Sequence, residues 1–331
     1  MYKNDIDNSD KILFFEPRIM ERPWGGTGLK EKWGYETGGI RAGECWGISA
    51  HPNGDLKIKE GSYRGETLSG LWKKAPELFG NRNEDGTLRK DRFPLLVKII
   101  DAGEDLSIQV HPDDAYAKKY ENGSLGKTEC WYVLEAPEGA SVVIGHNASD
   151  KEELADMIRN GRWKEFIREV PVEKGDLIRI DPGTVHAIKG GIEVLETQEN
   201  SDITYRVYDY DRVVDGKKRE LMIDRSLDVI RVPAEDIALS LKKASDYEGR
   251  EPDNGMIELM NCDYFILWKI RVEDSLTIRQ EYGFMAMTVI EGKGLAEGRE
   301  IQKGDHFLLL CGIGEVRFSG NMIIIASAPS C

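Results

Sequence analysis

Short apolar runs, several with polar residues in alternation, recur along most of this chain. Runs of this length, bounded by turn-forming residues, predict β-strands. Many of the 35 glycines stand between the runs, where turns between strands are expected. The sequence therefore predicts a mainly β fold, with strands at Leu56–Ile58, Leu95–Ile100, Leu106–Val110, Glu129–Glu135, Ser141–Ile144, Leu177–Ile180, Ile192–Thr197 and Thr204–Tyr208.

Three segments show the helical spacing of apolar residues instead. The longest is Ser149–Glu169, where Ser149 can cap the first turn and Glu152 stands three residues later, as in a capping box. Shorter helices are predicted at Leu71–Phe79 and Lys218–Ile230. The buried face of the last one is predicted to consist of Leu221, Leu227 and Ile230.

A polar stretch near Lys242–Asn254 divides the chain into two parts. It predicts a linker between an N-terminal domain, residues 1–241, and a C-terminal β domain, residues 255–331. Each part contains the tripeptide Lys-Gly-Asp before an apolar strand, at Lys174–Asp176 and at Lys303–Asp305. This layout predicts two related β-barrels in one chain. The alternative is that Lys-Gly-Asp is merely a common turn tripeptide.

The composition is that of a globular protein, with 40% hydrophobic and 31% charged residues among 331. Lysine and arginine number 45 against 59 aspartate and glutamate residues, so the formal net charge is -14. Neither nucleic acid nor an anionic membrane is an expected partner of such an acidic chain. A small anionic substrate is still compatible, because a few local cations can override the global field.

The cysteines and the first residues bear on the cellular compartment. The cysteines are odd in number and show no Cys-x-x-Cys spacing, which argues against a disulfide framework and a thiolate zinc site. The N-terminal stretch MYKNDIDNSDKI is polar, and the longest apolar runs have only strand length. We therefore expect a cytoplasmic protein. The five cysteines are Cys45, Cys130, Cys262, Cys311 and Cys331.

Residues that can bind a metal stand near the ends of predicted strands. Side chains alternate along a strand, so Gln109 and His111 are expected on one face, and Pro112 ends that strand. The same parity places Lys127 and Glu129 on one face of the next strand. A cation and a carboxylate there can serve a metal and an anionic substrate.

His186 begins a further strand, just after a tight turn at Pro182-Gly183. Two imidazoles, a carboxylate and an amide oxygen form a plausible Zn²⁺ set with room for water or substrate. A single histidine in a β protein, however, is more often part of the core or the surface than a ligand. The members of the candidate set are His111, Glu129, His186 and Gln109.

Six motifs occur in the order RPWGGTGL, GECWGISAHPNG, SIQVHPDD, GKTECWYVLEA, DPGTVHAI and LETQENSDITYRVYDYDR. Together they closely resemble type I mannose-6-phosphate isomerase, also called phosphomannose isomerase, a family with the cupin fold. The likeness extends from about Phe15 to Arg212. The chain length and the lack of a long inserted helical domain resemble the short bacterial form.

The resemblance implies an enzyme that interconverts mannose 6-phosphate and fructose 6-phosphate through an enediol(ate), with one zinc ion per chain. The catalytic arginine of the family falls on Arg206, and two polar pocket positions fall on Lys127 and Glu196. The zinc ligands fall on His111, Glu129 and His186, with Gln109 as an additional ligand.

Other roles are assigned less directly. Glu196 is our first choice for the general base, although a metal-bound water or a histidine could take that role. Ser107 and Lys98 are candidates for contact with the phosphate. The C-terminal barrel is expected to hold no metal, because His306 has no second ligand near it at the required spacing. We expect a monomer or a homodimer.

Two other functions fit parts of the pattern. One is a non-catalytic cupin that binds a sugar or regulates another protein. The other is a different metal-dependent cupin enzyme, such as an iron oxygenase, because two histidines and a carboxylate satisfy that class as well. Arg206 could also form only a surface salt bridge with Asp202 or Asp209. Three tryptophans could line the pocket, but aromatic residues in β-barrels more often belong to the core, so the predicted site does not include them: Trp24, Trp46 and Trp131.

Overall fold

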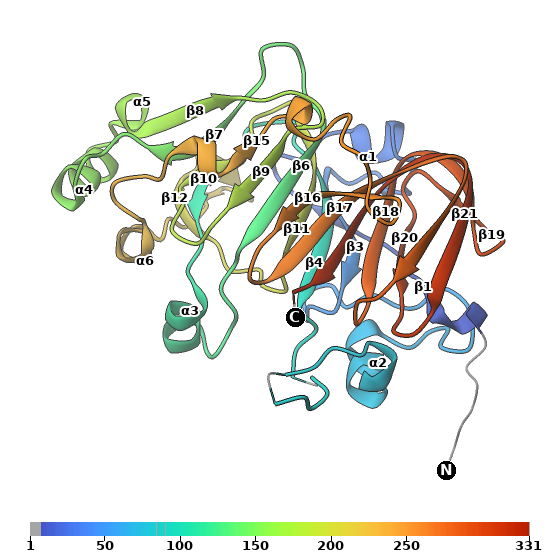
Figure 1. The fold of residues 1–331 in the computed structure, drawn as a ribbon. Helices are drawn as coiled ribbons and strands as arrows, with labels where there is room; N and C mark the ends of the chain where they lie inside the picture. The colour runs from blue at the N-terminus through green and yellow to red at the C-terminus, as the bar shows by residue number, and fades with distance from the viewer. Residues whose placement is uncertain (1–7, 84, 90, 331) are drawn as a thin grey trace.

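The computed structural model describes residues 8–83, 85–89 and 91–330, and these residues form a mainly β protein (Figure 1). Cys331 and the first seven residues, which the sequence predictions included, lie outside the described residues. Three large sheets contain nearly all of the strands. No helix in the described part of the chain is long and apolar enough to cross a membrane.

The N-terminal part is a sandwich of a seven-stranded and a five-stranded sheet. Apolar side chains from both sheets, such as Trp131, Val194 and Ile144, form one core between them. In sheet order, the seven strands are β15 (Leu241–Lys242), β9 (Leu177–Ile180), β6 (Glu129–Glu135), β11 (Glu193–Glu199), β4 (Leu95–Asp101), β3 (Ala42–Ser49) and β2 (Arg18–Glu21). The five strands are β12 (Tyr205–Tyr208), β5 (Ile108–Val110), β10 (His186–Ala187), β7 (Ser141–His146) and β8 (Ile167–Pro171).

The C-terminal part is built on one further sheet of seven strands. Side chains alternate along β17, so that Phe265 and Leu267 pack against the N-terminal part while Trp268 and Ile270 enter a separate apolar core. In sheet order the strands are β1 (Ile12–Phe14), β20 (His306–Leu309), β18 (Met285–Ala296), β21 (Gly314–Pro329), β17 (Phe265–Gln280) and β16 (Met256–Asn261), with β19 (Arg299–Gln302) paired to β18.

The expected division into residues 1–241 and 255–331 does not hold for the start of the chain. Strand β1 pairs antiparallel with β20, with Ile12 opposite Leu309 and Phe14 opposite Phe307. It therefore belongs to the C-terminal sheet, where it covers an edge of β20 that would otherwise expose unpaired backbone groups. Within the expected linker Tyr247 is buried, at 1% exposed, whereas most of the other linker residues are exposed.

The helix predicted at Ser149–Glu169 is too long. Helix α4 (Lys151–Arg159) is capped by Asp150, not by Ser149, and the Asp150 carboxylate accepts the amides of Glu152 and Glu153. Gly161, with a φ of +66°, then turns the chain, because a left-handed residue ends a helix. The short helix α5 (Trp163–Phe166) and strand β8 occupy the rest of the segment.

The other two predicted helices are shorter than expected. Pro76 ends the regular part of the first, which is helix α2 (Leu68–Lys74) followed by a 3₁₀ turn. The second, α6, begins only at Ile223, because Lys217–Lys218 (β14) pair with Val213–Val214 (β13) in a hairpin. Leu221, which was predicted to be buried in this helix, is accordingly 41% exposed. The strand predicted at Leu56–Ile58 does not form, because this segment makes only isolated bridges. The remaining helices are α1 (Gly28–Glu31), α3 (Asp114–Tyr120) and α6 (Ile223–Val229), with 3₁₀ turns at Asn8–Lys11, Pro76–Leu78, Ile237–Leu239 and Ala244–Asp246.

Candidate metal centre and active site

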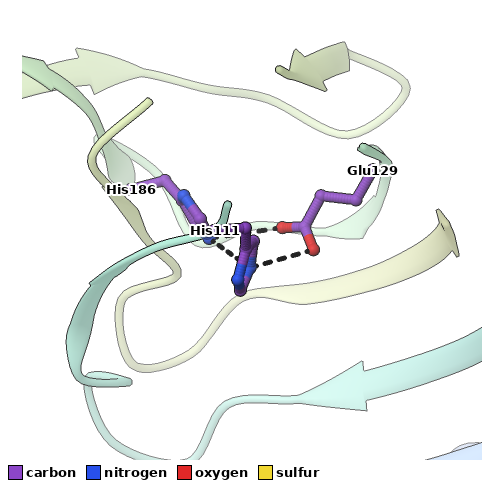
Figure 2. Close-up of side chains that lie close together, drawn as sticks. All are labelled: His111, Glu129 and His186. Atoms are coloured by element: carbon purple, nitrogen blue, oxygen red, sulfur yellow. Dashed lines mark hydrogen bonds and ion pairs between the residues drawn. The ribbon is translucent and has the colours of Figure 1, made fainter. Parts of the chain in front are cut away.

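Three side chains from both sheets of the N-terminal sandwich converge at one point (Figure 2). His111 follows strand β5, His186 begins β10, and Glu129 begins β6. One donor atom from each lies within 4.8 Å of the other two, and none of the three side chains is exposed. The sequence predicted this trio, and the packing of the two sheets brings it together.

Backbone carbonyls orient both imidazoles. The Nδ1–H of His111 donates to the carbonyl of Ile203 over 2.7 Å, and that of His186 donates to Thr184 over 2.9 Å. The two Nε2 atoms therefore face each other, 3.1 Å apart. Burial, assisted by Lys127, lowers the pKa of His111 to about 3. A neutral imidazole with its Nδ1 occupied presents the Nε2 lone pair that a metal requires.

Glu129 supplies the negative charge of the trio. Its Oε2 lies 2.8 Å from Lys127 Nζ and 3.3 Å from His111 Nε2, and its Oε1 lies 3.4 Å from His186 Nε2. Burial opposes ionisation, but Lys127 and the histidines hold the pKa of Glu129 well below its usual range. Its buried Oε1 accepts no hydrogen bond from the described residues. Two neutral imidazoles and a carboxylate with an unused oxygen fit a divalent cation such as Zn²⁺.

Gln109 lies next to the trio. It is the cross-strand partner of His186, and its Nε2 lies 3.2 Å from His186 Nε2. Rotation of the amide by half a turn would bring its oxygen to the same place. The face shared by Gln109 and His111 is as the strand parity predicted, since Ile108 and Val110 pack on the other side.

A cavity of about 380 Å³ adjoins the trio. Gln109 and Lys127 line the cavity and also contact the trio, which places the candidate metal site at its wall. All the other predicted site residues face this space: Lys98, Ser107, Gln109, Lys127, Glu196 and Arg206. Polar residues that sequence reasoning missed also line it: Arg22, Glu44, Asp202, Thr204 and Arg219. Trp24 and Trp131 belong to the core, as predicted, and line the cavity as well.

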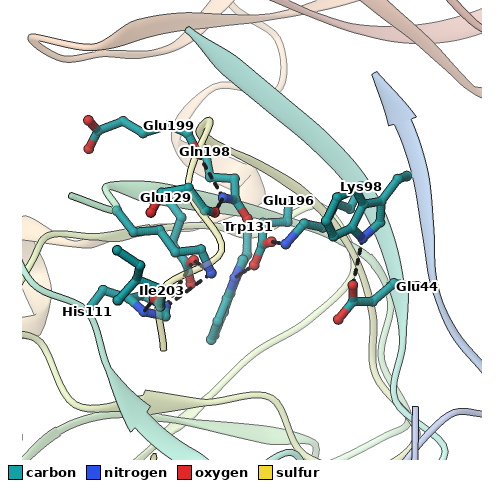
Figure 3. A network of polar contacts seen from close by, with 12 residues as sticks. Glu44, Lys98, His111, Glu129, Trp131, Glu196, Gln198, Glu199 and Ile203 are labelled. Atoms are coloured by element: carbon teal, nitrogen blue, oxygen red, sulfur yellow. Dashed lines mark hydrogen bonds and ion pairs between the residues drawn. The ribbon is translucent and has the colours of Figure 1, made fainter. Parts of the chain in front are cut away.

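A row of polar side chains crosses the seven-stranded sheet (Figure 3), and several of its members line the cavity. Glu196 on β11 stands opposite Lys98 on one side and Trp131 on the other. Its Oε2 lies 2.9 Å from Lys98 Nζ, and its Oε1 accepts the Trp131 indole N–H over 3.2 Å. Burial and the nearby Glu129 raise the pKa of Glu196. The carboxyl is thus held in a fixed position with an increased affinity for a proton.

The missed pair Arg22 and Glu44 extends this row. Arg22 Nε donates to Glu44 Oε1 over 2.8 Å, and the Trp46 indole donates to Glu44 Oε2 over 2.7 Å. Burial opposes ionisation, yet Lys98 and Arg22 lower the pKa of Glu44 to about 2. The strand parity of Glu44 and Trp46 in GECWG was a usable signal, and Arg22 begins the motif RPWGGTGL, which was used only for the family likeness.

Arg206 does not form the surface salt bridge considered as an alternative. Among the described residues, no ion pair joins it to Asp202 or Asp209. The carboxylate of Asp209 binds Arg219 and Arg212 instead, over 2.6 Å and 3.1 Å. Arg206 is the cross-strand partner of Gln109, and it donates to the carbonyl of Glu220 over 2.9 Å. Arg206 therefore lies beside Gln109 on the five-stranded sheet, and both residues line the cavity.

Comparison with known proteins gives consistent matches along the chain. Residues 13–139 match the family model of the phosphomannose isomerase type I catalytic domain, and residues 256–329 match that of the mannose-6-phosphate isomerase cupin domain. The chain is 46% identical to mannose-6-phosphate isomerase ManA of Bacillus subtilis, over 95% of this chain and 98% of that protein. It is 42% identical to the mannose-6-phosphate isomerase of Streptococcus mutans, over 95% and 97%.

A solved structure agrees with these sequence matches. The mannose 6-phosphate isomerase from Bacillus subtilis superimposes with a TM-score of 0.86 at 39% identity. The superposition covers 96% of this chain and 99% of that one, so both the N-terminal sandwich and the C-terminal sheet have counterparts there.

Proposed function

This chain belongs to the type I phosphomannose isomerase family, and on that basis we propose that it interconverts mannose 6-phosphate and fructose 6-phosphate with one Zn²⁺ per chain. The reaction is an aldose–ketose isomerisation in the cavity beside His111, Glu129 and His186. The observation that carries the proposal is the pair of neutral Nε2 atoms, 3.1 Å apart, which face a carboxylate at the wall of that cavity.

The cavity and the metal set suit an open-chain sugar phosphate. A volume of about 380 Å³ lies within the usual range for small-molecule sites. The trio, with Gln109 as an additional ligand, would hold the zinc ion, which would supply a Lewis acid for the oxygens of the open-chain sugar. Polar side chains around the cavity can then hold the hydroxyl groups in one orientation.

Glu196 is the proposed general base. A proton leaves C2 to give an enediol(ate), and a proton returns at C1. A carboxyl with a raised pKa, held between Lys98 and Trp131, can accept and return that proton. Because Lys98 already pairs with Glu196, its first role in this proposal is to orient the base, and contact with the phosphate is secondary.

Positive charge beside the cavity suits the two anionic groups of the reaction. Arg206 has a permanent charge and lies beside Gln109, where it can stabilise the enediolate or the phosphate. Lys127, whose ammonium group contacts Glu129, can bind a sugar oxygen. Ser107 is 4% exposed on the cavity wall and can donate to the phosphate together with these cations.

The test combines metal analysis with a coupled assay. The purified protein is analysed for bound metal, and conversion of mannose 6-phosphate is coupled to detection of fructose 6-phosphate. We expect zinc at one ion per chain, loss of activity with a chelator, and recovery when zinc is added back. Activity that survives complete metal removal would overturn the metal role. A zinc-loaded protein that binds the sugar phosphate without converting it would favour a non-catalytic cupin.

A further inference from the structure

The segment Gly126–Glu129 carries two groups of the site, the ammonium of Lys127 and the carboxylate of Glu129. Its first three backbone amides each have a separate acceptor. The amide of Gly126 donates to Asp114 Oδ1 over 2.7 Å, and that of Lys127 donates to the carbonyl of Pro112 over 3.1 Å. The amide of Thr128 donates to Glu199 Oε2 over 2.7 Å. The backbone on both sides of Lys127 is therefore fixed by two carboxyl groups.

The two carboxyl groups come from different elements and lie outside the cavity. Asp114 is the first residue of α3, and Glu199 is the last residue of β11. Neither lines the cavity, and Figure 3 shows the Glu199 carboxyl pointing away from the row that contains Glu196 and Lys98. The amide of Glu199 also donates to the carbonyl of Thr128 over 3.0 Å, so two hydrogen bonds join Glu199 to Thr128.

Glu199 and Asp114 are two acidic side chains that lie close together. Glu199 is 4% exposed, and its burial, together with the nearby Asp114, raises its pKa to about 7. Tyr264, from the turn between β16 and β17, faces the same two carboxyl groups, and burial and Glu199 raise its pKa to about 12. A protonated Glu199 can donate to Asp114 and still accept the Thr128 amide, which satisfies a buried carboxyl that would otherwise be costly.

We propose that Glu199 and Asp114 form a carboxyl clamp that positions Lys127 and Glu129 for metal binding and isomerisation. Both are positioning residues, because they act through the backbone of Gly126–Thr128 and touch neither the metal site nor the cavity. A shift of about 1 Å in a reacting group can cost up to about a hundredfold in rate. The part of the proposal that concerns isomerisation rests on the proposed activity, whereas the part that concerns metal affinity rests only on the proposed metal site.

The clamp is tested with two variants of the same position. Glu199→Gln keeps an acceptor for the Thr128 amide and a donor toward Asp114, so its zinc affinity and kcat are expected within about twofold of the original. Glu199→Leu has a similar size but loses both contacts. Its zinc affinity and kcat are expected to fall by about tenfold or more, as for other residues that support a metal ligand, with little change in KM.

Glu193→Leu is the matched control. Glu193 is also buried on β11, at the opposite end of the strand, where it accepts the indole N–H of Trp33 over 3.0 Å and pairs with Lys32. Its loss is expected to lower the temperature of unfolding but to leave zinc affinity and kcat nearly unchanged. Asp114→Ala, on the other side of the clamp, is expected to change both in the same direction as Glu199→Leu.

Zinc affinity is measured on metal-free protein by competition with a coloured chelator, kcat and KM by the coupled assay, and folding by thermal unfolding. A folded Glu199→Leu variant with unchanged zinc affinity and kcat would overturn the clamp, and so would an equal loss in Glu193→Leu. If Glu199→Leu does not fold, the comparison of Asp114→Ala with Glu193→Leu decides. A wild-type protein without isomerase activity would overturn the proposed function, while the zinc affinities would still decide the clamp.

Discussion

The N-terminal sandwich and the C-terminal sheet contain the same turn but enclose different interiors. In the first, Gly175 has a φ of +91° and Asp176 Oδ2 accepts the amide of Glu173 over 2.9 Å. In the second, Gly304 has a φ of +93° and Asp305 Oδ2 accepts the amide of Gln302 over 2.8 Å. The Lys-Gly-Asp likeness in the sequence is therefore also a likeness of conformation, as expected if the two halves are related.

The interiors behind these turns differ in polarity. The sandwich buries the charged groups Lys98, Glu129 and Glu196 beside its apolar core. The C-terminal sheet buries no carboxylate among the described residues, and its core contains apolar residues such as Ile270 and Phe307. Buried charges are unfavourable unless they are paired and hydrogen-bonded. The N-terminal sandwich, the polar half, therefore contains the candidate active site, while the C-terminal sheet, the apolar half, provides a well-packed support.

Removing a proposed metal ligand should affect only the N-terminal sandwich. For His111→Ala we expect loss of zinc and a fall in kcat/KM of about a thousandfold or more, because a Lewis acid contributes several kcal/mol to such a reaction. Metal content and the coupled assay measure both effects. Retained zinc with full activity would contradict the assignment of His111.

Shortening a core side chain of the C-terminal sheet should lower stability without removing the metal. Phe307 is completely buried and packs on Phe14 with ring centroids 5.1 Å apart. Phe307→Ala is expected to lower the free energy of unfolding by about 3–5 kcal/mol, while the folded variant keeps its zinc and its kcat. Denaturant unfolding with metal analysis provides the measurement. A loss of zinc from the folded variant would show that the two halves are not separable.

Within the polar half, Arg206 separates metal binding from turnover. Arg206→Ala is expected to keep its zinc and to lose about a hundredfold in kcat, a typical effect of removing one group that stabilises developing charge. The check is zinc content measured beside kcat in the same preparation. Loss of zinc in this variant would instead mean that Arg206 has a structural role.

His306 is a buried polar group within the C-terminal sheet, at the start of β20, and its replacement gives the smallest expected effect. Tyr35 donates its hydroxyl hydrogen to the carbonyl of Gly304 over 2.7 Å, so the Nε2–H of His306 donates to the Tyr35 oxygen over 2.9 Å. The Thr288 hydroxyl lies 3.0 Å from Nδ1. Burial lowers the pKa of His306 from 6.5 to about 3, so the folded protein holds the imidazole neutral.

The stability that comes from this lowered pKa is complete above the ordinary value of 6.5 and is lost as the pH falls toward 3. Between those values it should fall by about 1.4 kcal/mol per pH unit, because only the unfolded chain binds the proton. In His306→Gln, this contribution to the pH dependence of the free energy of unfolding should be absent. The free energy of unfolding of the zinc-loaded proteins is compared at neutral and mildly acidic pH, and equal slopes in both proteins would refute the assignment.

Seven of the eight strands predicted from apolar runs and local alternation are present in the structure, and the same alternation indicated which polar side chains share a face. The side chains of Gln109 and His111, and those of Lys127 and Glu129, share a face because successive strand residues point to opposite sides. The motifs then identified the family that the comparisons confirm. Helix limits were less accurate, because one residue such as Gly161 or Pro76 outweighs the helical spacing around it.

Only the tertiary structure decided what depends on register and on packing between sheets. Strand parity places a side chain on a face, but the distance from Glu129 to His186 is set by how two sheets pack over many side chains. Nothing local to Arg22 or Glu199 shows that one lines the cavity and the other holds Thr128, because their partners are distant in the sequence. The sequence alone determined which faces carry the polar groups, and long-range packing determined which of them meet.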